Sequence, residues 1–142
     1  MAQVDQTQTP ASLRQRIRDA GLKWTASRGA VLLALLQADK PLSHAELTEL
    51  LDAHGFDRAT IYRNLMDLTG GGLVARADMG DHVWRFEAKT HEAALHPHFM
   101  CTSCGAVQCL PESAVDVFAP AIKGAVRRVD EVLLKGACAA CA

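Results

Sequence analysis

Four of the five cysteines in this chain form two Cys-x-x-Cys pairs. Cys101 with Cys104 makes the first pair, and Cys138 with Cys141 makes the second. In such a turn two thiolates face one ion, and two turns complete the tetrahedral four-sulfur shell that zinc accepts. Because a closed shell leaves no position for a substrate, we expect a structural zinc site. Metal-free buried cysteines and a rubredoxin-like iron site are the alternatives.

A second group of possible metal ligands lies around the first cysteine pair. His96 and His98 are two residues apart, so on a strand both imidazoles would lie on one face. Glu87 and the unpaired Cys109 are the nearest further donors in sequence. Together these four would make a four-coordinate site for zinc or a similar divalent ion. Surface histidines and a core cysteine are the plain alternatives. Two further histidines flank the glutamate and are secondary candidates: His82 and His91.

The bulk composition is that of one ordinary domain or two small ones. The 142 residues are 49% hydrophobic, and their net charge of −1 gives no argument for nucleic acid. Because no apolar run reaches membrane-spanning length and the start lacks a signal-peptide pattern, we expect a cytoplasmic protein without membrane association. In that compartment clustered cysteines more often hold metal than form disulfides. No nucleophile–base pairing or glycine-rich phosphate loop indicates an enzyme.

The first half of the chain has the pattern of several helices. Residues 1–10 are polar and without periodicity, so we expect a mobile tail there. From residue 11 to about residue 73 the pattern is helical, and the apolar run at residues 30–36 predicts a well-buried helix. Ser43 followed by Glu46 forms a capping box, which predicts that another helix begins at this point.

The next predicted helix has one face suited to DNA. Asp57 should cap it, and an apolar stripe at residues 61, 65 and 68 should face inward. Arginine can contact phosphate or guanine, tyrosine can pack on a thymine methyl group, and a hydroxyl can bind phosphate. The residues expected on the exposed face are Ala59, Thr60, Tyr62, Arg63 and Asn64.

Strand patterns follow the three glycines at residues 70–72. Residues 73–77 and 82–86 flank a polar turn, which predicts a β-hairpin. A helix-turn-helix followed by a hairpin is a winged helix, so we predict a DNA-binding domain over residues 11–87. A metal-binding domain is expected over residues 88–142. Its predicted elements are strands at Phe99–Cys101, Val107–Leu110 and Val129–Lys135 and a helix at Glu112–Arg128 that Pro120 kinks.

Together these motifs resemble the ferric uptake regulator family of metal-sensing repressors. The matching segments are GLKWTASR (residues 21–28), ATIYRNL (59–65), RFE (85–87), HPHFMCTSCG (96–105) and GACAAC (136–141). They resemble the family's opening motif, recognition helix, strand with an acidic ligand, HxHxxCxxCG block and closing GxCxxC. The resemblance implies an α+β fold: an N-terminal winged helix, then a small C-terminal α/β dimerisation domain with the four-cysteine site.

The resemblance also implies partners and site residues. It implies a homodimer that binds a palindromic operator in double-stranded DNA, with Lys23 and Arg28 of the opening motif among the DNA contacts. By motif position, the sensory ligands are Glu87, His96 and His98. Cys109 stands where many members carry Glu or Asp as a further ligand. The sensory site is expected at the hinge between the two domains.

Departures from the family pattern bear on which metal is sensed. Pro41 stands where iron and peroxide sensors usually place a histidine, and His44 is a possible replacement. Asp130 replaces another usual histidine, so the optional third site is expected to be absent or weak. A thiolate from Cys109 in place of a carboxylate favours zinc over ferrous iron or manganese. We therefore predict a zinc-sensing repressor of metal-uptake genes. An iron, manganese, nickel or peroxide sensor, or a thiol redox-switched regulator, is the alternative.

Overall fold

The computed structural model forms two compact units. Its described residues are 9–89, 97–111, 113, 122–129 and 131–142. The first unit comprises Met1–Ala38 and Leu42–Thr90, and the second comprises Asp39–Pro41 and His91–Ala142. The roles expected of the two parts stay predictions: DNA binding for residues 11–87 and dimerisation for residues 88–142.

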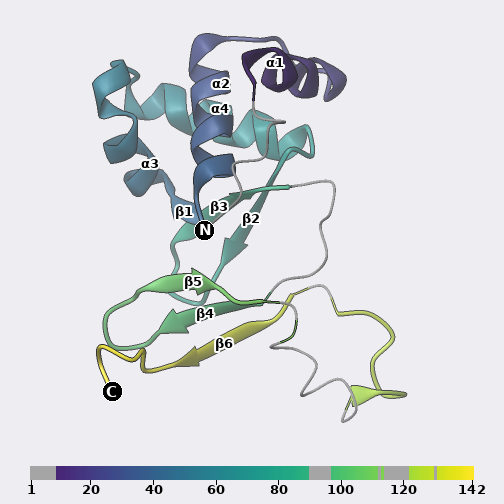
Figure 1. Cartoon of the computed structure of the whole chain (residues 1–142), viewed down its shortest axis with the longest axis vertical. Helices are drawn as coiled ribbons and strands as arrows, with labels where there is room; N and C mark the ends of the chain where they lie inside the picture. The colour runs from purple at the N-terminus through teal and green to yellow at the C-terminus, as the bar shows by residue number, and fades with distance from the viewer. Residues whose placement is uncertain (1–8, 90–96, 112, 114–121, 130) are drawn as a thin grey trace. The chain divides into compact units, whose positions relative to one another are not determined.

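Helices make up most of the first unit (Figure 1). They are α1 (Pro10–Asp19), α2 (Ala26–Gln37), α3 (His44–Leu50), the 3₁₀ helix η1 (Asp52–His54) and α4 (Arg58–Gly70). Each α-helix begins after a residue whose side chain accepts a hydrogen bond from a first-turn N–H, which satisfies one otherwise unpaired donor. The predicted caps Ser43 and Asp57 are confirmed. Of these described helices, none is long and apolar enough to cross a membrane.

The predicted tail needs a correction at its end. Pro10 is the first residue of α1, and the Thr9 side chain accepts a hydrogen bond from the Ser12 N–H at 3.2 Å. Proline fits the first helical turn because its missing N–H would be unpaired there in any case. Residues 1–8 lie outside the described part of the chain.

A three-stranded sheet completes the first unit. Strands β2 (Val74–Asp78) and β3 (Trp84–Ala88) form the predicted antiparallel hairpin, and β1 (Leu42–Ser43) pairs with β3 on the other side. The sequence did not indicate β1, because a strand of two residues, the second of which is the cap of α3, is too short to show an alternating pattern. The hairpin strands begin and end one or two residues later than predicted.

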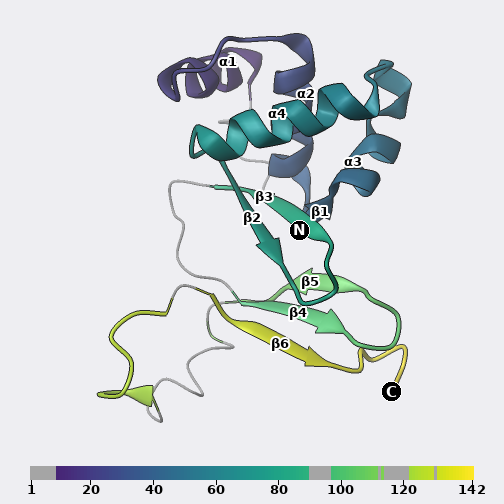
Figure 2. The same ribbon diagram turned by 180° about the vertical axis from the view of Figure 1, so that it is seen from behind.

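The core of the first unit joins its helices to this sheet. In the predicted stripe of α4, Ile61, Leu65 and Leu68 are all fully buried, which confirms that prediction. They belong to one cluster with residues of α1, α2, α3 and the sheet, such as Phe86 of β3. Helices α2 and α4 cross beside the sheet, as both views show (Figure 2). Because one side of α4 is held in this core, its opposite side faces outward.

The second unit is built on another three-stranded sheet. Strand β4 (His98–Cys101) lies between β5 (Val107–Cys109), which is antiparallel to it, and β6 (Leu133–Gly136), which is parallel to it. The strands occur within or close to their predicted segments. The helix predicted over Glu112–Arg128 lies mostly outside the described residues. Ile122 is helical, as predicted, but residues 123–127 carry turns, a bend and an isolated bridge, and Gly124 has a φ of +89°, so the predicted helix ends before Arg128.

Candidate metal centres and nucleic-acid interface

The two Cys-x-x-Cys turns follow neighbouring strands of the second sheet, at the same end of the sheet. Cys101 is the last residue of β4, and it is in register with Gly136, the last residue of the parallel strand β6. Cys104 follows in the turn after β4, and Cys138 and Cys141 follow β6. Because parallel neighbours end at the same edge of a sheet, four thiols that are far apart in sequence come together.

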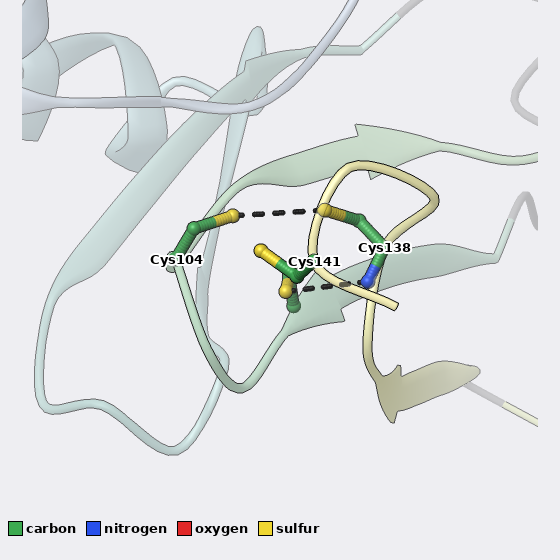
Figure 3. Close-up of side chains that lie close together, drawn as sticks. Cys104, Cys138 and Cys141 are labelled. Carbon is green, nitrogen blue, oxygen red and sulfur yellow. Dashed lines mark hydrogen bonds between the residues drawn. The ribbon is translucent and has the colours of Figure 1, made fainter.

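The geometry of the four thiols fits a tetrahedral ion. Their Sγ atoms all lie within 4.8 Å of one another. Cys104 Sγ and Cys138 Sγ are 3.8 Å apart. Figure 3 shows these two side chains pointing toward each other. Zinc–sulfur bonds of about 2.3 Å in a tetrahedron place two sulfurs about 3.8 Å apart, whereas a disulfide needs about 2.05 Å. All five cysteines are free thiols. The cluster predicted from the sequence is therefore present with spacing suited to zinc.

Backbone donors prepare one thiol of the cluster for metal. The N–H groups of Cys104 and Cys138 donate to Cys101 Sγ, the latter at 3.3 Å, and lower the Cys101 pKa to about 6. Hydrogen bonding with Cys138 raises the Cys141 pKa to about 12. Four sulfurs this close cannot all ionise alone, because their charges repel. A divalent cation would stabilise all four thiolates, which are the form that binds metal.

The second group of predicted ligands is partly brought together. His98 of β4 is directly opposite Cys109 of β5, and a ring nitrogen and the Sγ atom lie within 4.8 Å of each other. His98 is buried and Cys109 half-buried. Residues directly opposite each other in an antiparallel pair point to the same face, so strand register alone sets this imidazole beside this thiol.

Of the other predicted ligands, Glu87 and His82 belong to the first unit, and His96 and His91 fall outside the described residues. Glu87 lies in β3 of the first unit, half-buried and in register with Ala75 of β2. His82 is exposed in the turn between β2 and β3, with a φ of +61°. His96 and His91 belong to the part of the chain that the structure does not describe.

The outward side of α4 carries most, though not all, of the residues predicted to face DNA. Tyr62 is 48% exposed, Ala59 and Arg63 are exposed, and Thr60 is half-buried. The expectation that Asn64 shares this exposed face is wrong. Asn64 is buried, and its Nδ2 donates to Ser27 Oγ of α2 at 2.9 Å.

A sequence model of the ferric uptake regulator family matches residues 19–126, which is well over half of the 142 residues. The chain belongs to the ferric uptake regulator family. Members of this family are metal-responsive transcriptional regulators, and the four-cysteine cluster and the α+β fold agree with that membership.

Individual relatives within the ferric uptake regulator family support the match. Ferric uptake regulation protein 1 of Mycolicibacterium fortuitum is 35% identical over 96 residues, which are 64% of this chain and 56% of that protein. The ferric uptake regulation protein of Bacillus subtilis is 30% identical over 108 residues, 73% of this chain and 72% of that protein. The crystal structure of the Vibrio cholerae ferric uptake regulator is 30% identical, with a TM-score of 0.71 over 88% of this chain and 98% of that one.

One arginine of the family's opening motif has a structural role that the sequence does not indicate. Lys23 is exposed, but the Arg28 side chain is only 13% exposed. Arg28 Nη2 lies 2.6 Å from Asp67 Oδ2 of α4, and Nη1 donates to the Lys23 carbonyl oxygen. Arg28 therefore joins α2 to α4, and its predicted DNA contact would compete with this ion pair. Arg58, which no sequence motif singled out, is also exposed in the first turn of α4 beside the predicted face.

Proposed function

We propose that this chain is a zinc-sensing, homodimeric repressor that binds a palindromic operator when its sensory site is loaded. The observation that carries the choice of metal is the pairing of His98 with Cys109 across β4 and β5. Imidazole and thiolate together suit zinc, whereas sites for iron(II) or manganese usually contain carboxylates and fewer soft donors. Membership in a family of metal-responsive regulators supports the rest of the proposal.

The DNA-binding part of the proposal rests on α4. Its buried side is fixed in the core, and its outward side presents Tyr62 and Arg63 beside the exposed Ala59. A helix held this way behind a helix-turn can lie in the major groove, with its arginine reaching phosphate or guanine. Lys23, in the segment between α1 and α2, supplies a further cation for the DNA backbone, and two copies of the chain in a homodimer would bind two half-sites.

The two metal centres would have different roles. Cys101, Cys104, Cys138 and Cys141 would hold a structural zinc ion that stabilises the second unit. His98 and Cys109, together with His96 and Glu87, would hold the sensed ion, and His82 and His91 are secondary candidates. Because Glu87 belongs to the first unit and the other three to the second, filling this site would link the two units.

Such a link explains how metal could control DNA binding. When the sensory ligands are unoccupied, nothing in this site restricts the orientation of the two winged helices in a dimer. The ligands bind an ion best when the units are closed on each other, so metal shifts the population to the closed arrangement. Closure would set the spacing of the two copies of α4 to that of two half-sites.

The test measures DNA affinity as free zinc is varied. Duplexes that bind the zinc-loaded protein are selected from a randomised pool, and binding is followed by fluorescence anisotropy. The double variant His96→Ala with His98→Ala should need far more zinc for the same occupancy, whereas His54→Ala removes an exposed histidine outside both ligand groups and should behave as wild type. Operator binding by the double variant that equals wild type at every zinc concentration would refute the sensory assignment.

Iron is the second candidate for the sensed metal, because the relatives at 30–35% identity are named ferric uptake regulation proteins. The variant Cys109→Asp discriminates the two. If the thiolate selects zinc, this variant should lose zinc-dependent binding relative to its response to iron(II) or manganese(II). An unchanged order of metals in Cys109→Asp would mean that Cys109 is not a sensory ligand.

A further inference from the structure

Both tryptophans of the chain lie in the first unit, and an arginine lies over each ring. Arg14 is 5.1 Å from the ring centroid of Trp24, and Arg76 is 4.4 Å from that of Trp84. The first pair is part of the packing, because Trp24 fills the space beside Gly29, where an added Cβ would lie 2.1 Å from the ring. The second pair is at the surface, since Trp84 is 49% exposed and Arg76 is exposed.

Strand register explains how this surface pair forms. Trp84 is opposite Asp78, and Arg76 is opposite Phe86, so Arg76 and Trp84 are diagonal neighbours on one face of the hairpin. Phe86 on that face is buried in the core, whereas Trp84, two residues earlier, is not covered by the helices. The pair therefore lies on the same face of the hairpin as the buried Phe86, but beyond the part of that face that the helices cover.

The pair also adjoins the outward side of α4. Arg76 Nη1 lies 3.9 Å from Met66 Sδ. Met66 is one helical turn beyond Tyr62 and Arg63, so these three side chains occupy neighbouring positions on α4. The guanidinium of Arg76 thus extends the predicted DNA-facing surface from α4 onto the hairpin. Among the described residues, Arg76 forms no ion pair.

We propose that Arg76, stacked on Trp84, is a binding site for a backbone phosphate of duplex DNA beside the bases that α4 contacts; this rests on the proposed DNA-binding function. The planar guanidinium offers several donors that match phosphate oxygens, and stacking leaves its edge free to use them. The indole limits the motion of the long arginine side chain, which lowers the ordering cost of binding. The exposed indole edge can contact the adjoining deoxyribose.

The test is the salt dependence of binding to the selected operator duplex and to a scrambled duplex. Each phosphate contact contributes about 0.9 to the slope of log affinity against log salt, so Arg76→Ala should reduce the slope of a dimer by about 1.8. Because phosphate carries no sequence information, affinity should fall by a similar factor on both duplexes. Trp84→Ala should weaken both duplexes, and Trp84→Phe should retain more affinity than Trp84→Ala. Arg127→Ala, which removes one exposed charge from the second unit, is the charge-matched control.

The outcomes separate the two proposals. If the wild-type protein binds operator in a zinc-dependent way but Arg76→Ala has the wild-type slope, the phosphate site is wrong and the proposed function stands. Loss of operator binding with unchanged binding to scrambled duplex would assign Arg76 to base recognition and would also overturn the phosphate site. No duplex binding by the wild-type protein would overturn both proposals. Thermal unfolding of Arg76→Ala checks that this variant is folded.

Discussion

Replacing Cys104 by alanine tests whether metal holds the second unit together. Cys104 is an exposed member of the four-cysteine cluster. An exposed side chain remote from any special interaction usually changes stability by about 0.5 kcal/mol or less when it is truncated. If the cluster holds zinc, however, the same substitution removes one of four ligands. The effect of Cys104→Ala should therefore depend on metal, which separates a lost ligand from lost packing.

The expected size of the effect follows from how few apolar side chains are buried among the described residues of the second unit. Besides Pro41, Pro97 and Cys101, the buried apolar side chains that the structure describes there are Met100 and Val107. Each contributes about 2 kcal/mol on burial, so the pair contributes about 4 kcal/mol. A structural zinc ion contributes about 10–16 kcal/mol at neutral pH. Zinc would thus exceed the buried side chains as a source of stability, and the unit should unfold without it.

Zinc content and hydrogen exchange of β4, β5 and β6 measure the result. Wild-type protein should keep one zinc ion per chain through dialysis against a moderate chelator and show slow exchange in these strands. Cys104→Ala should lose the ion and the protection, whereas Cys104→His should retain much of both because three cysteines and one histidine also bind zinc. Equal protection in Cys104→Ala and wild type, or equal destabilisation by this substitution with and without chelator, would refute the reasoning.

Three further predictions concern the first unit. Gly29→Ala should destabilise it by about 1–3 kcal/mol in urea unfolding and shift tryptophan fluorescence, because the new Cβ would lie 2.1 Å from the Trp24 ring; an unchanged midpoint would contradict this packing. Asn64→Ala should cost about 1 kcal/mol, and a double-mutant cycle with Ser27→Ala should show coupling, since the two side chains are hydrogen-bonded at 2.9 Å; additive effects would exclude the bond. The Asp57 pKa is lowered because the threonine three residues on donates its hydroxyl and N–H to the carboxylate. The stability that ionised Asp57 adds should therefore be present above pH 3.8 and be lost as pH falls through the folded-state pKa of Asp57. If the free energies of unfolding of wild type and Asp57→Ala differ by the same amount at pH 7 and pH 2, this prediction is wrong.

Local chemistry made much of the fold predictable from sequence. The caps at Ser43 and Asp57 and the stripe containing Ile61 involve residues within one or two turns of each other, so their pattern is visible in the sequence. The two-residue strand β1 was missed because its pairing with β3 joins positions about 40 residues apart. The predicted helix at residues 112–128 extends too far: Ile122 is helical, but Gly124 adopts left-handed geometry, which ends the helix.

The candidate metal centres were predictable to different degrees for the same reason. The spacing of the two Cys-x-x-Cys pairs alone predicts a metal site. The structure adds the parallel pairing of β4 with β6, which brings the two pairs together. Cys109 has no such local signal. Its relation to His98 depends on the register of β4 and β5, which sequence spacing does not fix. The Arg76–Trp84 stack depends on register in the same way and was not predicted.

The polar residues that join α2 to α4 show why motif matching alone cannot assign DNA contacts. Asn64 and Arg28 lie in segments that resemble DNA-contacting motifs, yet Asn64 binds Ser27 and Arg28 binds Asp67. Both links connect the helix bearing Tyr62 to the helix behind it. They can therefore influence DNA binding without touching DNA, by fixing the rotation of α4 about its own axis. Loss of either link would allow the outward face to turn, which should weaken sequence-specific contacts more than contacts with phosphate.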